Sequence, residues 1–382
     1  MTAASAADRP EPKPAGPQQA DSRQPDSQQP DSQQAESRQA DSRQAESQSA
    51  AQQSAGPSGS VRRSRDVPML VDLARQGDPR AVARLITLVE SGDELLPQVA
   101  AALAPYTGRA QVIGLTGSPG VGKSTTTNEL VRALRARDHR VGVLAVDPSS
   151  PFTGGAILGD RVRMQDHATD PGVYIRSMSS RGHLGGLAAA TPQAVRVLEG
   201  AGCDVVLVET VGVGQAEVEV ASLADTTLVL LAPGMGDAIQ AVKAGILEIA
   251  DVFVVNKADR DGADATVRDI NGMIALGERG PGQWRPRVVR AVAVRGEGID
   301  DLVTAVEKHH GWLVEHGELR RRREARAAAE VEAIALGTLR DRIGSLRAGT
   351  SLGALAARVA DGSLDPYAAA GELLDQLGRA TG

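Results

Sequence analysis

Short apolar runs alternate with segments of helical periodicity through the middle of the chain. Seven runs rich in Val, Ile and Leu show little polar alternation, as expected for strands that are covered on both faces. They are QVIGLTG (111–117), RVGVLAVD (140–147), VYIRSM (173–178), CDVVLVET (203–210), TTLVLLAP (226–233), VFVVNKAD (252–259) and VVRAVAV (288–294). Segments between them, such as STTTNELVRALRARD, have helical spacing. The pattern predicts an α/β domain with a doubly wound, mostly parallel sheet over residues 108–312.

Helical patterns flank this domain on both sides. Residues 66–107 carry apolar positions at helical spacing with interruptions at 77–79 and 91–93, which predicts two or three short N-terminal helices. Residues 313–382 contain ELRRRREARAAAEVEAIALGTLRDRI, which predicts a long charged helix with an apolar stripe, followed by two shorter helices. Such a stripe needs a partner surface, either the domain itself or a second copy of the chain.

The first 65 residues follow neither pattern. From Asp21 onward an acidic residue, Ser, and Gln or Arg recur with a period of five, which fits neither a helix nor a strand. The repeats contain no large apolar residue, so burial cannot offset the entropy lost on ordering. We therefore predict a disordered Gln/Ser-rich tail over residues 1–65, and its role stays open.

Composition limits the cellular compartment and the classes of partner to expect. The net charge of −6 over 382 residues supplies no global positive field for nucleic acid. The single cysteine, Cys203, rules out a disulfide framework within one chain and is typical of a reducing compartment. The N-terminus has no apolar signal core, and no run approaches the roughly 18 apolar residues that span a bilayer. We expect a cytoplasmic protein without a nucleic-acid or membrane partner.

The stretch GSPGVGKST matches the phosphate-loop pattern of Gly, four residues and Gly-Lys-Ser, between a predicted strand and a predicted helix. Backbone N–H groups of such a loop wrap the α- and β-phosphates, and the helix N-terminus adds its dipole. Lys123 would place its charge near the β/γ bridge, and Ser124 would offer its hydroxyl to Mg²⁺. The predicted contacts are Gly117, Ser118, Pro119, Gly120, Val121, Gly122, Lys123, Ser124 and Thr125.

The sequence NKAD, Asn256 to Asp259, indicates which base is bound. A carboxylate at Asp259 would accept hydrogen bonds from guanine N1 and N2, whereas adenine lacks the 2-amino donor. Lys257 would lie over the base plane. A strand followed by a simple turn is the alternative for a four-residue match taken alone. The later AVAVRGEGI is expected to contact guanine O6 around Val294, Arg295 and Gly296.

Three carboxylates compete for the metal and the attacking water. Asp147 and Glu209 end predicted strands, and Asp160 lies in the loop GGAILGDRVRM. Each is a candidate Mg²⁺ ligand and, with Lys123, a candidate catalytic residue, although Asp147 before Pro148 also suits a turn. In ETVGVGQ, Gly212 is expected to donate its N–H to the γ-phosphate. Gln215 is a candidate for orienting the water, and that assignment stays open.

The stretch APGMGDAIQAVKAGI is predicted to be a flexible segment that switches with the nucleotide. Gly234 and Gly236 permit rearrangement, and Asp237 and Lys243 would exchange partners when the nucleotide changes; a loop entering a helix is the alternative. The histidines show no metal-ligand spacing.

Together, GSPGVGKST, VDPSSPFTGGAILGDRVRM, RSMSSRGHLGGL, ETVGVGQAE, APGMGDAIQAVKAGI and NKAD resemble the methylmalonyl-CoA mutase-associated GTPases, the MeaB or ArgK type, from about Val67 to the C-terminus. The resemblance implies a P-loop GTPase of the class of the signal recognition particle, MinD and BioD. It also implies that GTP and Mg²⁺ gate delivery of adenosylcobalamin to an acyl-CoA mutase, usually methylmalonyl-CoA mutase, and protect that enzyme from inactivation. Members are typically homodimers held by C-terminal helices, which would give residues 313–382 their partner.

Two other functions fit parts of this pattern. One is a nickel-insertion GTPase, against which the single cysteine and the tail without His-rich tracts argue. The other is a scaffold that binds GTP without hydrolysing it. An older name for the family refers to phosphorylation of transport proteins, but the sequence offers no identifiable kinase aspartate.

Overall fold

The structure is a computed structural model that describes residues 66–148, 165–167, 169–180, 190–210, 216–234, 247–277, 280, 282–348 and 351–379. The chain divides into two compact units, Met1–Gly59 and Ser60–Gly382, and every described residue belongs to the second. None of the described helices combines the length and the apolar character that a bilayer span requires.

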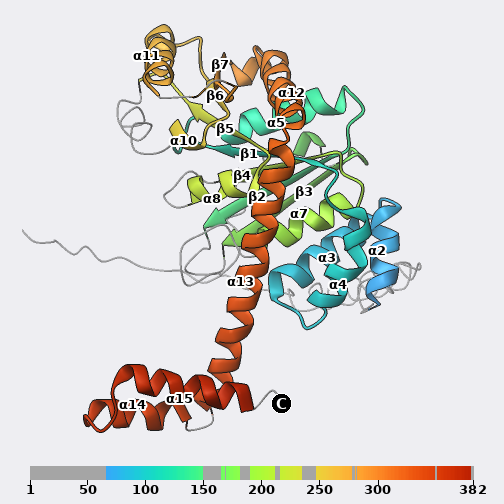
Figure 1. Cartoon of the computed structure of the whole chain (residues 1–382). Helices are drawn as coiled ribbons and strands as arrows, with labels where there is room; N and C mark the ends of the chain where they lie inside the picture. The colour runs from blue at the N-terminus through green and yellow to red at the C-terminus, as the bar shows by residue number, and fades with distance from the viewer. Residues whose placement is uncertain are drawn as a thin grey trace, which may run out of the picture. The chain divides into compact units, whose positions relative to one another are not determined.

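A seven-stranded, all-parallel sheet forms the centre of the described chain (Figure 1). The spatial order is β3-β2-β4-β1-β5-β6-β7. The strands are β1 (Gln111–Thr116), β2 (Val141–Pro148), β3 (Val173–Ser180), β4 (Val205–Thr210), β5 (Thr226–Leu231), β6 (Val252–Val255) and β7 (Arg287–Arg290). All seven predicted strands are present, which confirms the α/β prediction. The last strand ends earlier than predicted, because Val292 turns back to bridge Glu297 and Ala293–Arg295 form a 3₁₀ turn, η5.

Successive residues of each strand point into different cores. Val112 joins one apolar cluster, whereas its neighbour Ile113 joins another on the opposite face of the sheet. This alternation means that both faces need cover. Helices α5 (Lys123–Arg135) and α12 (Ile299–Glu315) supply it on one face, and α7 (Thr191–Gly200) and α8 (Ala216–Leu223) on the other. A third cluster lies between β5, β6 and α11 (Ala263–Leu276). The short α10 (Leu247–Ile249) precedes β6, and a 3₁₀ turn, η3 (Gln165–His167), precedes β3.

Three N-terminal helices extend the core beyond the sheet. They are α2 (Val67–Arg75), α3 (Pro79–Ser91) and α4 (Leu96–Leu103), followed by the 3₁₀ turn η2 (Ala104–Tyr106). Asp66 caps α2 by accepting a hydrogen bond from Met69 N at 3.1 Å, and Asp78 caps α3 by accepting one from Arg80 N at 2.7 Å. Short polar side chains before a Pro in the first helical turn favour a helix start, which explains why these two helices begin at these positions.

The C-terminal helices are α13 (Glu318–Ala348), α14 (Ser351–Ala360) and α15 (Pro366–Arg379). The long charged helix and its two shorter successors are thus present as predicted. An ion pair of 2.7 Å between Arg358 and Glu372 joins α14 to α15.

The first turns of α13 are anchored to the sheet by buried ion pairs, which we call the arginine clamp. Asp225, immediately before β5, is fully buried and pairs with Arg323 at 2.8 Å and with Arg326 at 3.2 Å. Asp251, immediately before β6, pairs with Arg322 at 2.9 Å. The clamp therefore grips the edge of the sheet at which the strands begin.

Candidate nucleotide-binding site

The opposite edge, where the parallel strands end, carries the nucleotide motifs. The phosphate loop follows β1, which lies between β4 and β5. NKAD follows β6, which lies on the other side of β5. Ligands of open parallel sheets bind at this carboxyl edge, where the strand order reverses direction. The topology therefore brings the carboxyl ends of β4, β1, β5 and β6 side by side at one edge of the sheet.

Two glycines of the phosphate loop occupy positions that no other residue fits. Gly117 has φ +137°, and a Cβ built there would lie 2.3 Å from the Leu230 carbonyl oxygen. Gly122 has φ +97°, and its Cβ would lie 2.3 Å from Nδ2 of Asn256. These close approaches explain why both positions are glycine, because any side chain there would collide with β5 or with NKAD.

Lys123 begins α5 and is folded back onto its own loop. Its Nζ donates hydrogen bonds to the carbonyl oxygens of Gly117, at 2.7 Å, and Ser118, at 3.1 Å. The side chain is only 7% exposed, so its charge is held at the mouth of the loop rather than in solvent.

Glu209, the penultimate residue of β4, meets the first turn of α5. Its Oε1 accepts a hydrogen bond of 2.5 Å from the Ser124 hydroxyl, and its Oε2 accepts one of 2.9 Å from Thr127. The carboxylate is buried. Sequence reasoning picked out Ser124 and Glu209 but missed Thr127, whose only signal was its place one turn after Ser124 in the run STTT.

Asn256 joins the phosphate loop to the loop after β7. Its Nδ2 donates to the Val121 carbonyl at 2.8 Å, and its Oδ1 accepts from Ala293 N at 3.1 Å. Lys257, in the left-handed region at φ +56°, donates from Nζ to the Gly120 carbonyl at 2.6 Å. Both donors of NKAD therefore fix the spacing between the phosphate loop and the segment that would face a base.

Asp259 faces the segment that follows β7. Its Oδ2 accepts a hydrogen bond of 3.0 Å from Arg295, whose side chain is 55% exposed. Val294 is 79% exposed, and Gly296 ends η5 with φ +71°. The structure thus gathers Asp259 with the predicted residues Val294, Arg295 and Gly296.

Other predicted positions are only partly described. Asp147 lies near the end of β2, beside β4, but its side chain is outside the described residues. Gly234 follows β5 with φ +80°. Asp160, Gly212, Gln215, Gly236, Asp237 and Lys243 lie outside the described residues.

The sequence matches the methylmalonyl-CoA mutase-associated GTPase MeaB family over residues 82–347. The chain belongs to this family. It is a P-loop GTPase, consistent with the phosphate loop, the parallel sheet and NKAD described above.

Individual relatives extend along most of this MeaB-family chain. A Pyrococcus abyssi protein whose name assigns it to the GTPases is 46% identical over 312 residues, covering 81% of this chain and 96% of the relative. The mouse protein named methylmalonic aciduria type A homolog, mitochondrial, is 37% identical over 282 residues, covering 69% and 68%. A crystal structure titled LAO/AO transport system kinase has 27% identity and a TM-score of 0.61, covering 82% of this chain and 97% of that one.

The MeaB-family site has donors that suit Mg²⁺. This ion takes oxygen ligands and keeps few protein contacts, since phosphates and water complete its octahedron. The Ser124 hydroxyl and the Glu209 carboxylate are such oxygens and already lie 2.5 Å apart. The described residues contain no group of three or more His, Cys, Asp or Glu side chains placed to hold a metal. An ion shared with nucleotide phosphates needs no such group.

Proposed function

We propose that this MeaB-family GTPase binds GTP with Mg²⁺ and hydrolyses it to gate delivery of adenosylcobalamin to a B12-dependent acyl-CoA mutase. The same cycle would protect the mutase, which we take to be methylmalonyl-CoA mutase, from inactivation. The observation that carries the nucleotide assignment is Asn256, which hydrogen-bonds both to the phosphate loop and to the segment beside Asp259. The family match supports the mutase as partner.

Each described site residue has a role in this proposal. Lys123 would exchange the two loop carbonyls for phosphate oxygens, which are stronger acceptors for an ammonium group. Ser124 and Glu209 would hold Mg²⁺, whose charge stabilises the negative charge that develops on the transferred phosphoryl group. Asp259 would accept the N1 and N2 donors of guanine in place of Arg295.

The remaining predicted residues belong to the proposal on sequence grounds. Asp147 and Asp160 would complete the metal shell, and Gly212 would contact the γ-phosphate. Gly234 to Lys243 would couple the nucleotide state to the mutase. The proposal also includes a homodimer, because α13 carries a set of exposed apolar side chains that a second copy could cover. They are Val331, Ile334, Leu336 and Leu339.

The decisive experiment measures GTP turnover by the full chain with and without a cobalamin-loaded methylmalonyl-CoA mutase from the same organism. We expect slow turnover alone and a clear rise with the mutase. Lys123→Ala should abolish turnover in both cases, whereas Lys308→Ala, at an exposed position of α12, should leave both rates unchanged.

The outcomes separate the parts of the proposal. If turnover depends on Lys123 but no acyl-CoA mutase of the organism raises it, the partner is wrong and the GTPase assignment stands. A Lys123→Ala variant that binds GTP and still supports mutase activity in cells would favour a scaffold. Stoichiometric nickel binding would favour a nickel-insertion role.

A further inference from the structure

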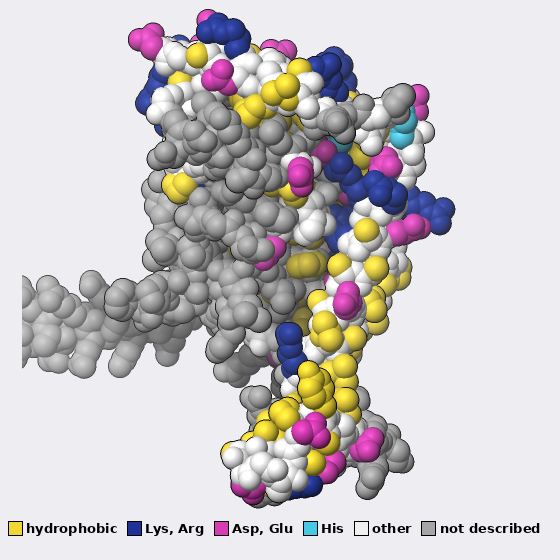
Figure 2. Space-filling model, turned by 60° about the vertical axis from the view of Figure 1, so that its left-hand side comes forward, with side chains coloured by type: hydrophobic (Ala, Val, Ile, Leu, Met, Phe, Trp, Pro, Cys, Tyr) yellow, Lys and Arg dark blue, Asp and Glu magenta, His cyan; other side chains and the backbone are white. Residues whose placement is uncertain are grey.

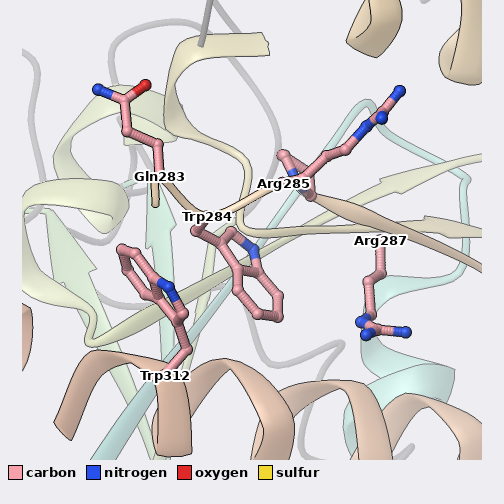
Figure 3. Close-up of a pocket in the computed structure, with 6 residues that line it drawn as sticks. Gln283, Trp284, Arg285, Arg287 and Trp312 are labelled. Carbon is pink, nitrogen blue, oxygen red and sulfur yellow. The ribbon is translucent and has the colours of Figure 1, made fainter. Parts of the chain in front are cut away.

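Both tryptophans of the chain line one groove. The groove has a volume of about 310 Å³ and is formed by Gln283, Trp284, Arg285, Pro286 and Arg287 before and within β7, together with Trp312 of α12 (Figure 3). It lies where β7 begins, the edge of the sheet opposite the nucleotide motifs. An occupant of this groove would therefore not compete with GTP.

The two indole rings are held in fixed positions. Trp284 donates from Nε1 to the Asp251 carbonyl at 2.8 Å, and its ring centroid lies 4.7 Å from that of His309, which is fully buried. Trp312 lies 5.8 Å from Trp284 and 4.7 Å from His316. Both indoles are nevertheless half-buried rather than buried. Rigid, partly exposed tryptophans lose little entropy on contact and are the commonest anchors of protein interfaces.

Two exposed guanidinium groups flank the rings. Figure 3 shows Arg285 and Arg287 beyond Trp284, on the side away from Trp312. Neither arginine forms an ion pair with any described residue, and the stretch from Pro281 to Arg290 contains no acid. Other exposed arginines of β7 and α13 do have partners: Arg290 with Asp264 at 2.6 Å, Arg320 with Glu324 at 2.7 Å and Arg321 with Glu318 at 2.6 Å.

We propose that this groove docks an acidic peptide segment of a partner protein. An apolar side chain of the segment packs against Trp284 and Trp312, and flanking carboxylates pair with Arg285 and Arg287. Trp and Arg are the residue types most enriched at binding hot spots, and the guanidinium fork matches a carboxylate in geometry. The whole chain has a net charge of −6, so the attraction to an acidic partner is confined to the surface around Arg285 and Arg287.

The groove supplies its own reporter, because all tryptophan emission of the protein arises there. The probe is a short capped peptide in which two leucines are flanked by glutamates, titrated into the full-length protein. We expect a saturable change in tryptophan emission that weakens with added salt, since exposed ion pairs are screened. Saturating GTP should leave the affinity unchanged.

Matched variants test the arginines. Arg285→Ala with Arg287→Ala should weaken binding at least about fivefold, the effect of two partly exposed ion pairs. Arg80→Ala with Arg268→Ala removes the same charge from exposed positions away from the groove and should change the affinity by less than about twofold. A peptide with glycines in place of the leucines should bind more weakly, because the indoles lose their apolar contact.

Four results would overturn the proposal. The first is no emission change with the acidic peptide, and the second is equal binding of a peptide with lysines in place of the glutamates. The third is an equal response to a single-stranded RNA oligonucleotide, which would make the groove a nucleic-acid site. The fourth is an emission change that follows protein concentration alone, which would assign the groove to a second copy of the chain.

Discussion

Gly122 stands at the closest contact between the phosphate loop and NKAD. Gly122→Ala should lower GTP affinity strongly, since the methyl group meets Asn256 and the residue is also left in a left-handed conformation. Gly120→Ala is the matched control: Gly120 has φ +78° but open space around its Cβ, so it isolates the backbone strain. Nucleotide titration of both variants measures the difference. Equal losses would mean that the contact with Asn256 does not matter.

Arg295 is hydrogen-bonded to the Asp259 carboxylate, the group that is proposed to read guanine. Its guanidinium group presents N–H donors to Asp259, as the N1 and N2 edge of guanine would, so the two compete. We expect Arg295→Ala to bind GTP more tightly, by up to about fivefold, the strength of an exposed ion pair. Isothermal titration with GTP measures this change. Weaker binding in the variant would show instead that Arg295 contacts the nucleotide directly.

At the residue scale, the sequence motifs predicted which side chains come together, whereas the chemical roles of these side chains stay predictions. Lys123, Ser124, Glu209 and Asn256 lie at one edge of the sheet, as their motifs indicated. Their present partners could not be predicted. Neither the bond from Thr127 to Glu209 nor that from Arg295 to Asp259 follows a local pattern, because each joins elements far apart in the sequence.

Among the elements, α13 depends on the arginine clamp. Asp225→Ala should lower the free energy of unfolding by about 3–5 kcal/mol, because it leaves Arg323 and Arg326 partly buried without their acid. Arg320→Ala, on the same helix but 85% exposed, should cost less than about 0.5 kcal/mol. Urea unfolding compares the two. A small loss in Asp225→Ala would show that the clamp adds little to stability.

The clamp also predicts a pH dependence. Burial would raise the pKa of the Asp251 carboxyl, but the His309 ring, whose Nε2 lies 3.2 Å from Oδ1, and the hydrogen bonds from Arg322 outweigh it and hold that pKa below its ordinary value. Its contribution to stability is therefore complete above the unfolded-state pKa of about 4 and is lost as the pH falls through the lower folded-state pKa.

Asp251→Asn tests this linkage. The variant should be less stable than the wild type at neutral pH, and its stability should fall less steeply on acidification below about pH 4. Urea unfolding of both proteins across this range gives the comparison. Parallel curves would assign the acid loss to other carboxyl groups, such as Asp170, whose pKa is lowered by its hydrogen bond from Arg135.

The existence of α13 was predictable, whereas its attachment was not. The run ELRRRREAR marked a charged helix, and solvent exposure is the usual state of such a run. Asp225 and Asp251, which pair with the three arginines of the clamp, immediately precede β5 and β6. In the sequence, a single aspartate before a strand looks like an ordinary turn residue.

For the whole molecule, the surface at issue is the apolar one on the C-terminal helices. Figure 2 shows hydrophobic side chains along α13 and over α14 and α15. Val331 is 67% exposed and Ile334 is 56% exposed. If this surface holds the proposed homodimer, Val331→Glu with Ile334→Glu should give a monomer in sedimentation equilibrium. Arg340→Glu makes the same change in net charge beside the surface and should stay dimeric. A double variant that remains dimeric would place the interface elsewhere.

Several statements about the chain as a whole stay predictions. They are the disordered tail over residues 1–65, the boundaries at 66–107, 108–312 and 313–382, and the cytoplasmic location, each predicted from composition and periodicity alone. Periodicity locates elements well, because it reflects burial. It says nothing of how elements join over long separations in the sequence.

The strand β6 is only four residues long, about 13 Å at 3.3 Å per residue. Asp251, held by Arg322 of α13, precedes its first residue, and Asn256 follows its last. Parallel ladders to β5 and β7 prevent the strand from sliding alone. Force applied to α13 would therefore reach the residues proposed to read guanine through one stiff strand. We therefore expect mechanical load on the C-terminal helices to change the rate of nucleotide release, which single-molecule pulling in the presence of nucleotide would measure.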